Sequence, residues 1–330
     1  MLAPRKHVKS LLQATGLLDP AKALRAKVFD AVEPALEWAW QWNERAYRRP
    51  VHSSPGERRR PEASALVASL RRDGIVRLPG FVGGERLARI QAGMDRMVGD
   101  LVTAPPAPTV IPSIKPVPSI LGLRKTWPGF PEYINDTANA EVFTYDPFRL
   151  VPELLDLALD EVLLDVVQGY FEKPAMMCIA VADRCYPLQP RDFSSFQWHH
   201  DGHGPKLNLM VLLTDVTEQD QRMAYLKGTH GFFHSRLRTA VNSRFTEEEV
   251  RALPQKEQML LTGVAGTAFL FDANGLHRGN RSLGATRDVM ITCYSAGKSW
   301  FPMSVPSRAR ESLSVEQRRF LERNPRVTYV

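Results

Sequence analysis

A short stretch, FQWHHDGHG at residues 196–204, contains three of the eight histidines of the chain and one aspartate. On a β-strand, successive side chains point to opposite faces, so His199 and Asp201 would share one face while His200 pointed to the other. An imidazole and a carboxylate on one face can bind a metal ion, but the same pair is also common as a hydrogen-bonded contact in a protein core. A third ligand from elsewhere in the chain must decide between these two interpretations.

His277 is the candidate for that third ligand. It ends an expected strand in the segment GTAFLFDANGLHRGNRSLGATRDVMITCY, and a turn rich in Gly, Asn and Ser then leads into a strand that begins near Arg287. Two imidazoles and one carboxylate form the facial set that binds Fe(II) and leaves three positions for a cosubstrate and O₂. His203 could replace His277 in this set, but Gly202 and the following Gly-Pro pair are expected to end the first strand before it.

The composition, with 44% hydrophobic and 24% charged residues, is that of an ordinary globular protein. The N-terminal residues lack the continuous apolar region of a secretory signal, and no stretch approaches 18 apolar residues, so a cytoplasmic protein without a membrane span is expected. The three cysteines are an odd number without CxxC spacing. They indicate reduced thiols and neither a disulfide framework nor a zinc site.

The chain carries a moderate excess of basic residues, 43 Lys and Arg against 36 Asp and Glu. Much of the excess lies in residues 1–62, but its runs are too short to favour nucleic acid, anionic lipid or an acidic substrate over a solvated linker. No basic stripe interleaved with aromatic residues accompanies it, so no nucleic-acid partner is expected. The sequence does not indicate an oligomeric state.

The order of apolar segments predicts three parts. Residues 1–62 are expected to form a helical N-terminal extension that ends in a linker rich in Pro, Ser and Arg. Residues 63–300 contain three expected helices, the last around Val151 to Phe171, followed by short apolar segments separated by turn residues, which is typical of an antiparallel sandwich or barrel. Within them, residues 103–120 carry six prolines and are expected to form an irregular lid or substrate wall. Residues 301–330 are expected to form a C-terminal helical tail.

Four segments of the chain resemble the phytanoyl-CoA dioxygenase-like family of Fe(II)/2-oxoglutarate-dependent oxygenases, which includes ectoine hydroxylases and many natural-product tailoring enzymes. They are RRDGIVRLPGFVGGERLARI, FQWHHDG, MVLLTDVTEQDQRMAYLKGTH and the hairpin that begins HRGNRS. The resemblance covers roughly residues 68–296. Members have a jelly-roll core of two antiparallel sheets, so the implied fold is mainly β, a double-stranded β-helix (jelly roll, cupin-like) with flanking α-helices, formed by residues 63–300.

The resemblance also implies roles for individual residues. His199, Asp201 and His277 would be the catalytic residues that hold the iron. Arg287, ten positions after His277, would pair with the distal carboxylate of the cosubstrate 2-oxoglutarate. A guanidinium suits this task because its fork can make two parallel hydrogen bonds to a carboxylate.

Further cosubstrate contacts are less closely defined. His200 occupies a position where relatives often place a polar residue near the cosubstrate, and Asn208 on the following strand could serve likewise. Ser282 is a third candidate, although it could instead hold the hairpin through hydrogen bonds to backbone groups. Many relatives carry a serine where this chain has Gly279, so the set of cosubstrate contacts is expected to differ here.

The function implied by the resemblance is hydroxylation of an unactivated C–H bond in a small polar metabolite of the natural-product type, either sugar-containing or derived from an amino acid. Lys125, Trp127 and Arg184 could line a polar or anionic substrate pocket. Related enzymes use the same chemistry to desaturate, close a ring or epimerise. The alternative is a non-redox metal-binding jelly roll, such as a cupin-like isomerase or a sugar-binding module, in which neither Arg287 nor the GTH segment would be needed.

Overall fold

The computed structural model defines most of the chain from residue 60 onward. The ranges described are 60–103, 110–111, 130–131, 133–136, 140–145, 147–189, 196–201, 206–231, 244–253, 257–296 and 303–330. The predicted N-terminal extension lies outside these ranges except for its last three residues. Most of the proline-rich segment 103–120 also lies outside them, and so do Lys125 and Trp127. Among the described residues, no helix has the length and apolar character needed to cross a membrane.

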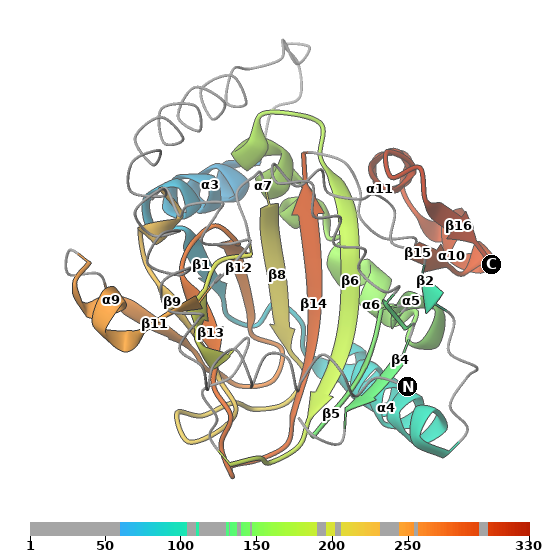
Figure 1. Cartoon of the computed structure of the whole chain (residues 1–330). Helices are drawn as coiled ribbons and strands as arrows, with labels where there is room; N and C mark the ends of the chain where they lie inside the picture. The colour runs from blue at the N-terminus through green and yellow to red at the C-terminus, as the bar shows by residue number, and fades with distance from the viewer. Residues whose placement is uncertain are drawn as a thin grey trace, which may run out of the picture. The chain divides into compact units, whose positions relative to one another are not determined.

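Two antiparallel sheets form the core (Figure 1). The larger sheet has, in spatial order, β1 (Ile75–Leu78), β12 (Ala268–Asp272), β8 (Lys206–Leu212), β14 (Arg287–Ser295), β6 (Met176–Cys185), β5 (Glu141–Thr144) and β4 (Tyr133–Asp136). The smaller sheet has β10 (Arg244–Phe245), β7 (Trp198–His199), β13 (His277–Gly279), β9 (Met223–Leu226) and β11 (Gln258–Leu261). From β6 to β9 and again from β11 to β14, consecutive strands alternate between the two sheets, as in a jelly roll, so the predicted mainly β fold is confirmed.

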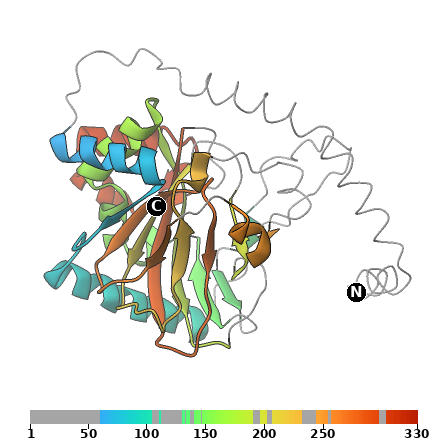
Figure 2. The same cartoon turned by 90° about the vertical axis from the view of Figure 1, so that its left-hand side faces the viewer.

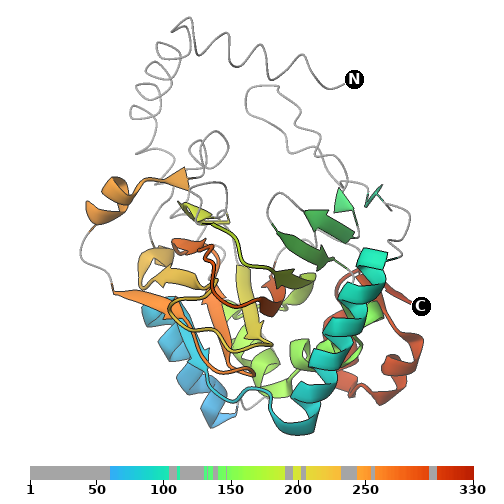
Figure 3. The same cartoon turned by 90° about the horizontal axis from the view of Figure 1, so that it is seen from below.

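Helices cover the face of the larger sheet that points away from the smaller one. Figures 2 and 3 show α3 and α4 on one side of the strands and α9 on the other. The helices that precede β6 are α3 (Pro61–Asp73), α4 (Gly84–Thr103), α5 (Pro147–Leu150), α6 (Glu153–Ala158) and α7 (Glu161–Phe171). The helix on the other side is α9 (Glu247–Arg251). In α4 the residues Ile90, Met94, Met97 and Leu101 are buried at intervals of three and four, which is the apolar face of an amphipathic helix.

Side chains on the strands of the larger sheet alternate between these helices and the smaller sheet. Val289 of β14 packs with Met210 and with Tyr225 of the smaller sheet, whereas Met290 belongs to the cluster that contains the helices. Arg287 therefore shares the face of Val289 and points toward the smaller sheet, because side chains alternate along a strand. The interior between the sheets is where the residues with possible chemistry converge.

The GTH segment packs beneath the end of α3. Gly74 caps this helix with a left-handed backbone, φ 77°, and its N–H donates to Leu70 O. A side chain at this position would meet His230, since a Cβ would lie 2.4 Å from its Nδ1. The glycine is thus required both by its backbone conformation and by the close approach of the 3₁₀ turn Thr229–Gly231.

The C-terminal residues are more than a helical tail. They contain α10 (Ser307–Ser312) and α11 (Val315–Glu322), but also β15 (Met303–Val305) and β16 (Val327–Tyr329), which pair in parallel. Phe320 and Leu321 are buried in the same cluster as the helices of the larger sheet. This segment therefore belongs to the core of the domain. A separate two-stranded ladder joins β2 (Val110–Ile111) and β3 (Phe130–Pro131).

Candidate active site

Strand pairing brings the three predicted metal ligands together at one end of the smaller sheet. His277 of β13 is the register partner of His199 of β7. Asp201 follows β7, and its N–H donates to Ala273 O at 3.0 Å. Asp201 Oδ1 lies 3.8 Å from His199 Nε2 and 3.6 Å from His277 Nε2, and the three potential ligand atoms all lie within 4.8 Å of one another. This separation suits binding of one cation by all three.

Both imidazoles are oriented by backbone carbonyls. His199 Nδ1 lies 2.8 Å from Gln197 O, and His277 Nδ1 lies 2.9 Å from Gly275 O. When each Nδ1–H donates to its carbonyl, each Nε2 keeps a lone pair that faces Asp201. Metal-binding histidines typically have this arrangement, in which the second ring nitrogen fixes the tautomer. The donor set of two imidazoles and one carboxylate therefore fits Fe(II).

The protonation states of His199 and Asp201 agree with this fit. Burial, reinforced by the neighbouring His277, lowers the pKa of His199 to about 3, so its ring is neutral near pH 7. Burial would raise the pKa of Asp201, but the two imidazoles hold it well below its usual range, so the group is a carboxylate. A neutral imidazole and an ionised carboxylate are the forms that bind metal. Burial would lower the pKa of His277, but the Asp201 carboxylate raises it, so this ring must give up a proton when a metal binds.

Aromatic packing fixes the position of His277. Its ring lies parallel to that of Tyr225 with the centroids 6.5 Å apart, and the Phe271 ring lies on another side at 5.5 Å. Tyr225 Oη donates to Asp272 O at 3.0 Å. Gly275 makes room for this hydroxyl, because a Cβ there would lie only 1.9 Å from Tyr225 Oη.

Asn208 holds the carboxylate ligand. Its Nδ2 donates to Asp201 Oδ2 at 3.2 Å, which leaves Oδ1 facing the two imidazoles. The Asn208 side chain is buried, and its Oδ1 accepts no hydrogen bond within the described part of the chain. The contact observed is therefore with a metal ligand, and the predicted contact with the cosubstrate stays a prediction.

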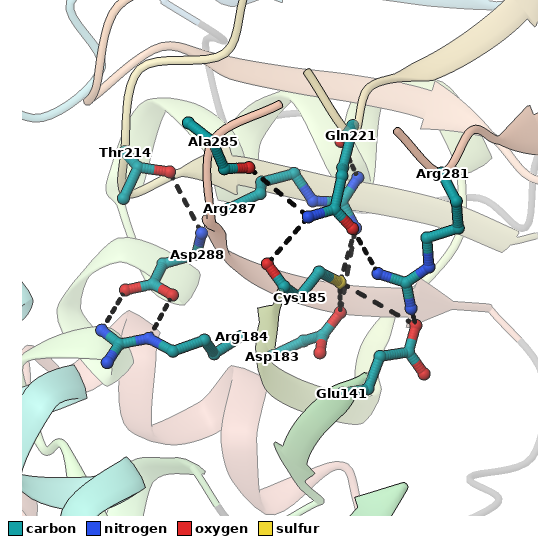
Figure 4. Close-up of polar contacts among 10 residues, drawn as sticks. All are labelled: Glu141, Asp183, Arg184, Cys185, Thr214, Gln221, Arg281, Ala285, Arg287 and Asp288. Carbon is teal, nitrogen blue, oxygen red and sulfur yellow. Dashed lines mark hydrogen bonds and ion pairs between the residues drawn. The ribbon is translucent and has the colours of Figure 1, made fainter. Parts of the chain in front are cut away.

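Arg287 lies inside the fold at the start of β14, opposite Cys185 of β6 (Figure 4). Its Nη1 donates to Gln221 O at 2.7 Å and its Nη2 to Cys185 Sγ at 3.2 Å. Asp183 Oδ2 lies 3.8 Å from Nη2. Nε has no acceptor among the residues that the structure describes. The guanidinium is thus ionised and buried, but only part of its hydrogen-bonding capacity is used.

A second buried arginine, which the sequence analysis did not single out, adjoins this group. Arg281 Nη1 donates to Gln221 Oε1 at 2.5 Å, and Nη2 forms an ion pair with Glu141 (Figure 4). Glu141, Asp183 and Cys185 also lie close enough to share a metal ion. Two adjacent guanidinium groups already balance the two carboxylates, so this cluster does not require a cation. The HRGNRS segment contained Arg281, but its partner Glu141 is distant in sequence.

Arg184 is directed away from this interior. It is the register partner of Asp288, and its Nε and Nη2 donate to that carboxylate at 2.7 and 2.5 Å. Nη2 also donates to Asp95 of α4 at 2.6 Å. The side chain therefore lies on the helix-covered face of the larger sheet, opposite to the face of Arg287. This placement argues against the predicted contact with substrate.

His200 and Ser282 also lie apart from the metal-ligand group. His200 is on the outer face of the smaller sheet, as the alternation predicted, with its ring 6.2 Å from that of Phe245. Ser282 Oγ accepts a hydrogen bond from Gly284 N at 3.1 Å, and its carbonyl accepts one from Leu188 N. Neither position supports the predicted contact with the cosubstrate, and Ser282 has the alternative role in the hairpin.

Comparison with protein families decides how this site is classified. The family model for phytanoyl-CoA dioxygenase (PhyH) matches residues 70–288, which is more than half of the chain. The chain belongs to the phytanoyl-CoA dioxygenase family. The PhyH match includes all three metal-ligand candidates and Arg287. Comparison with curated protein sequences gives no match.

Solved structures agree with the PhyH fold. The chain is similar to EctD from S. alaskensis with bound Fe, at 18% identity over 74% of this chain and 80% of that one, with a TM-score of 0.53. It is also similar to the epimerase SnoN in complex with Fe3+, alpha ketoglutarate and nogalamycin RO, at 16% identity over 71% of this chain and 83% of that one, with a TM-score of 0.50. At such identities the likeness concerns the fold alone.

The family and the site together define the class of enzyme. The protein is a 2-oxoglutarate-dependent non-haem iron oxygenase that uses Fe(II), 2-oxoglutarate and O₂. The resemblance found in the sequence is confirmed. The alternative of a non-redox metal-binding jelly roll is not favoured, since the PhyH match extends over the arginine as well as the metal-ligand candidates.

Proposed function

We propose that this PhyH enzyme hydroxylates an unactivated C–H bond of a small polar metabolite, with His199, Asp201 and His277 as its iron ligands and Arg287 as the anchor of 2-oxoglutarate. The observation that carries the proposal is the convergence of two Nε2 atoms on Asp201 Oδ1 while both Nδ1 atoms are held by carbonyl oxygens. Bound Fe(II) with 2-oxoglutarate supplies the activation of O₂ and the oxidation of the substrate.

The protein itself supplies orientation. The carbonyls of Gln197 and Gly275 keep both imidazoles in one tautomer, and Asn208 keeps one carboxylate oxygen of Asp201 aimed at them. These contacts preorganise the ligands before the metal binds, which strengthens metal affinity. Because Asp201 occupies the third ligand position, no position is left for a halide ligand, so hydroxylation is favoured over halogenation.

Arg287 is suited to a carboxylate partner. Its Nε has no acceptor within the described ranges, and Nη2 is engaged only by a thiol and by a carboxylate at 3.8 Å. A carboxylate could therefore accept two parallel hydrogen bonds from Nε and Nη2, while Nη1 keeps its bond to Gln221 O. The buried position strengthens such a contact, since water cannot compete for the donors.

The type of substrate is inferred from relatives. EctD is known in complex with 2-oxoglutarate and 5-hydroxyectoine, and SnoN with nogalamycin RO, so both bind small molecules. A small-molecule substrate of the natural-product type, sugar-containing or derived from an amino acid, is proposed here by the same reasoning. A cytoplasmic location is also proposed, because all three cysteines are buried free thiols, which suits a reducing compartment.

The proposal is tested by anaerobic titration of the full chain with Fe(II) and then 2-oxoglutarate. We expect a visible charge-transfer band that saturates at one equivalent of iron and, after O₂ is admitted, succinate release that increases with one group of compounds in a substrate panel. Hydroxylation is then read as a gain of one oxygen atom in the product. Absence of both the band and succinate would contradict the proposal. If succinate forms but the product has gained no oxygen atom, only the proposed hydroxylation would be wrong.

A further inference from the structure

Arg244 lies beside the metal-ligand candidates on the edge of the smaller sheet. It is the register partner of His199 in the antiparallel pair of β10 and β7. Directly opposite residues in such a pair have side chains on the same face, so Arg244 projects on the face that carries His199 and His277. Its charge interacts electrostatically with all three metal-ligand candidates.

Arg244 has no ion-pair partner among the described residues, and the carboxylate that acts on its charge is Asp201, a metal-ligand candidate. The other arginines close to the site each have an acidic partner: Arg287 has Asp183, Arg281 has Glu141, Arg278 has Glu247 and Arg184 has Asp288. The Arg244 side chain is partly buried, and it makes no hydrogen bond or ion pair with any residue that the structure describes. A guanidinium that has no ion-pair partner is available to bind an anionic group of a ligand.

The position of Arg244 is fixed by its neighbours. Phe245 is the register partner of Trp198 on the outer face, and both pack in one apolar cluster. Thr246 then begins α9 with a capping box that includes Glu249. Arg278 of β13 forms an ion pair with Glu247 and ties α9 to the sheet. The segment is therefore anchored on both sides of the backbone, while the Arg244 side chain projects toward the site.

Lys206 is a second cation whose charge acts on Asp201. Lys206 begins β8 two residues before Asn208, so both side chains lie on the interior face of the larger sheet. Its charge acts on Asp201 and stabilises the ionised form of that carboxylate, whose pKa is lowered. Once Asp201 is a ligand of Fe(II), its negative charge is shared with the metal and offsets the charge of Arg244 less.

We propose that Arg244 is a substrate-binding residue that recognises an oxyanion, a carboxylate, phosphate or sulfate group, on the molecule that is oxidised. This inference rests on the proposed function, because the metal defines where the reacting carbon lies. Arg244 and Arg287 belong to different sheets, which allows one arginine to bind the cosubstrate and the other the substrate. The substrate class is thereby narrowed from polar metabolites to anionic ones.

The test uses inorganic phosphate as the probe. The full chain is loaded with Co(II) in place of Fe(II) and saturated with 2-oxoglutarate, and the ³¹P relaxation of added phosphate is measured. Paramagnetic enhancement that saturates with phosphate places the anion near the metal. We expect Arg244→Gln to weaken this phosphate affinity by about tenfold or more, as for the loss of one hydrogen bond to a charged group. Arg251→Gln, which removes an exposed charge from the adjacent α9, should leave it unchanged.

The outcomes separate the two proposals. Equal enhancement in the wild type and in Arg244→Gln, or none in the wild type, would overturn the role of Arg244 while metal and 2-oxoglutarate binding persisted. A fall in 2-oxoglutarate affinity in Arg244→Gln would assign the residue to the cosubstrate and would also overturn its role in substrate binding. Failure of the wild type to bind Co(II) or 2-oxoglutarate would instead refute the proposed function on which this inference rests.

Discussion

Substitution of Arg287 separates the charge of the guanidinium from the geometry of its fork. Arg287→Lys keeps a cation but loses one of the two parallel hydrogen bonds expected with 2-oxoglutarate, whereas Arg287→Gln loses the charge as well. Loss of one hydrogen bond to a charged group costs about 1.5–3 kcal/mol, which corresponds to roughly 10- to 100-fold weaker binding for the lysine variant. Removal of a buried charged partner costs about 2–5 kcal/mol, or about 30-fold or more, for the glutamine variant.

The surroundings of Arg287 determine the controls. Asp183 lies 3.8 Å from Nη2, and its Oδ1 has no hydrogen-bond partner among the described residues, so removal of Arg287 leaves this carboxylate without its cation. We expect this loss to destabilise the fold by up to about 3 kcal/mol, because Asp183 is partly exposed and burial raises its pKa, so the carboxyl can take up a proton. The double variant Arg287→Gln with Asp183→Asn removes both charges and should recover much of the thermal stability without recovering 2-oxoglutarate affinity. Arg184→Lys is the matched control, because Arg184 is a partly buried arginine with an acidic partner on the opposite face of the same sheet.

The assay is anaerobic titration of the Fe(II) form with 2-oxoglutarate, followed by the visible charge-transfer band, with thermal unfolding of each variant in parallel. We expect affinity to fall in the order wild type, Arg287→Lys, Arg287→Gln, with Arg184→Lys close to wild type. Iron affinity should be the same in all variants that fold. The reasoning is refuted if the double variant folds like the wild type and binds 2-oxoglutarate equally well.

Three further predictions concern the residues around the metal ligands. Asn208→Ala removes the hydrogen bond to Asp201 Oδ2 and should weaken Fe(II) affinity by about 10- to 100-fold in an anaerobic competition assay, with 2-oxoglutarate affinity little changed; unchanged iron affinity would show that Asn208 does not position the ligand. Gly275→Ala places a Cβ 1.9 Å from Tyr225 Oη and should cost about 1–3 kcal/mol of folding free energy in chemical denaturation, a prediction that a variant of wild-type stability would exclude. Burial raises the pKa of the Cys185 thiol well above its usual range, so iodoacetamide should not modify it in the native chain even at pH 9. Rapid labelling of native Cys185, detected by mass spectrometry, would contradict its burial.

The sequence predicted those features of the structure that depend on a local pattern of residues. The expected alternation placed His199 and Asp201 together and His200 apart from them, and the structure has this placement although β7 itself ends at His199. The pairing of His277 with His199 is a non-local contact that periodicity cannot predict; the hairpin that follows His277 and then the family resemblance indicated His277 as the third ligand. The mainly β class followed from short apolar segments separated by turn residues.

The sequence was insufficient where strand register determines the role of a side chain. In the register of β14 and β6, Arg287 lies opposite Cys185 and points between the sheets. The next pair, Asp288 and Arg184, therefore points to the other face, which the helices cover. Composition alone cannot distinguish a paired arginine from one available to a ligand. Arg281 was missed for the same reason, since Glu141 is its partner across 140 positions of sequence. Arg244 lies on a strand of two residues, too short for any periodic pattern.

The most direct test of the central claim is the coupling of triad-bound iron to oxidation of 2-oxoglutarate. Iron content and O₂-dependent succinate formation are measured for the full chain, for His277→Ala and for His203→Ala, a histidine that the sequence analysis excluded from the ligand set. The account predicts one iron per chain and succinate formation in the wild type and in His203→Ala, and loss of both in His277→Ala. Retention of iron and of succinate formation by His277→Ala at the wild-type level would contradict the assignment of the metal centre.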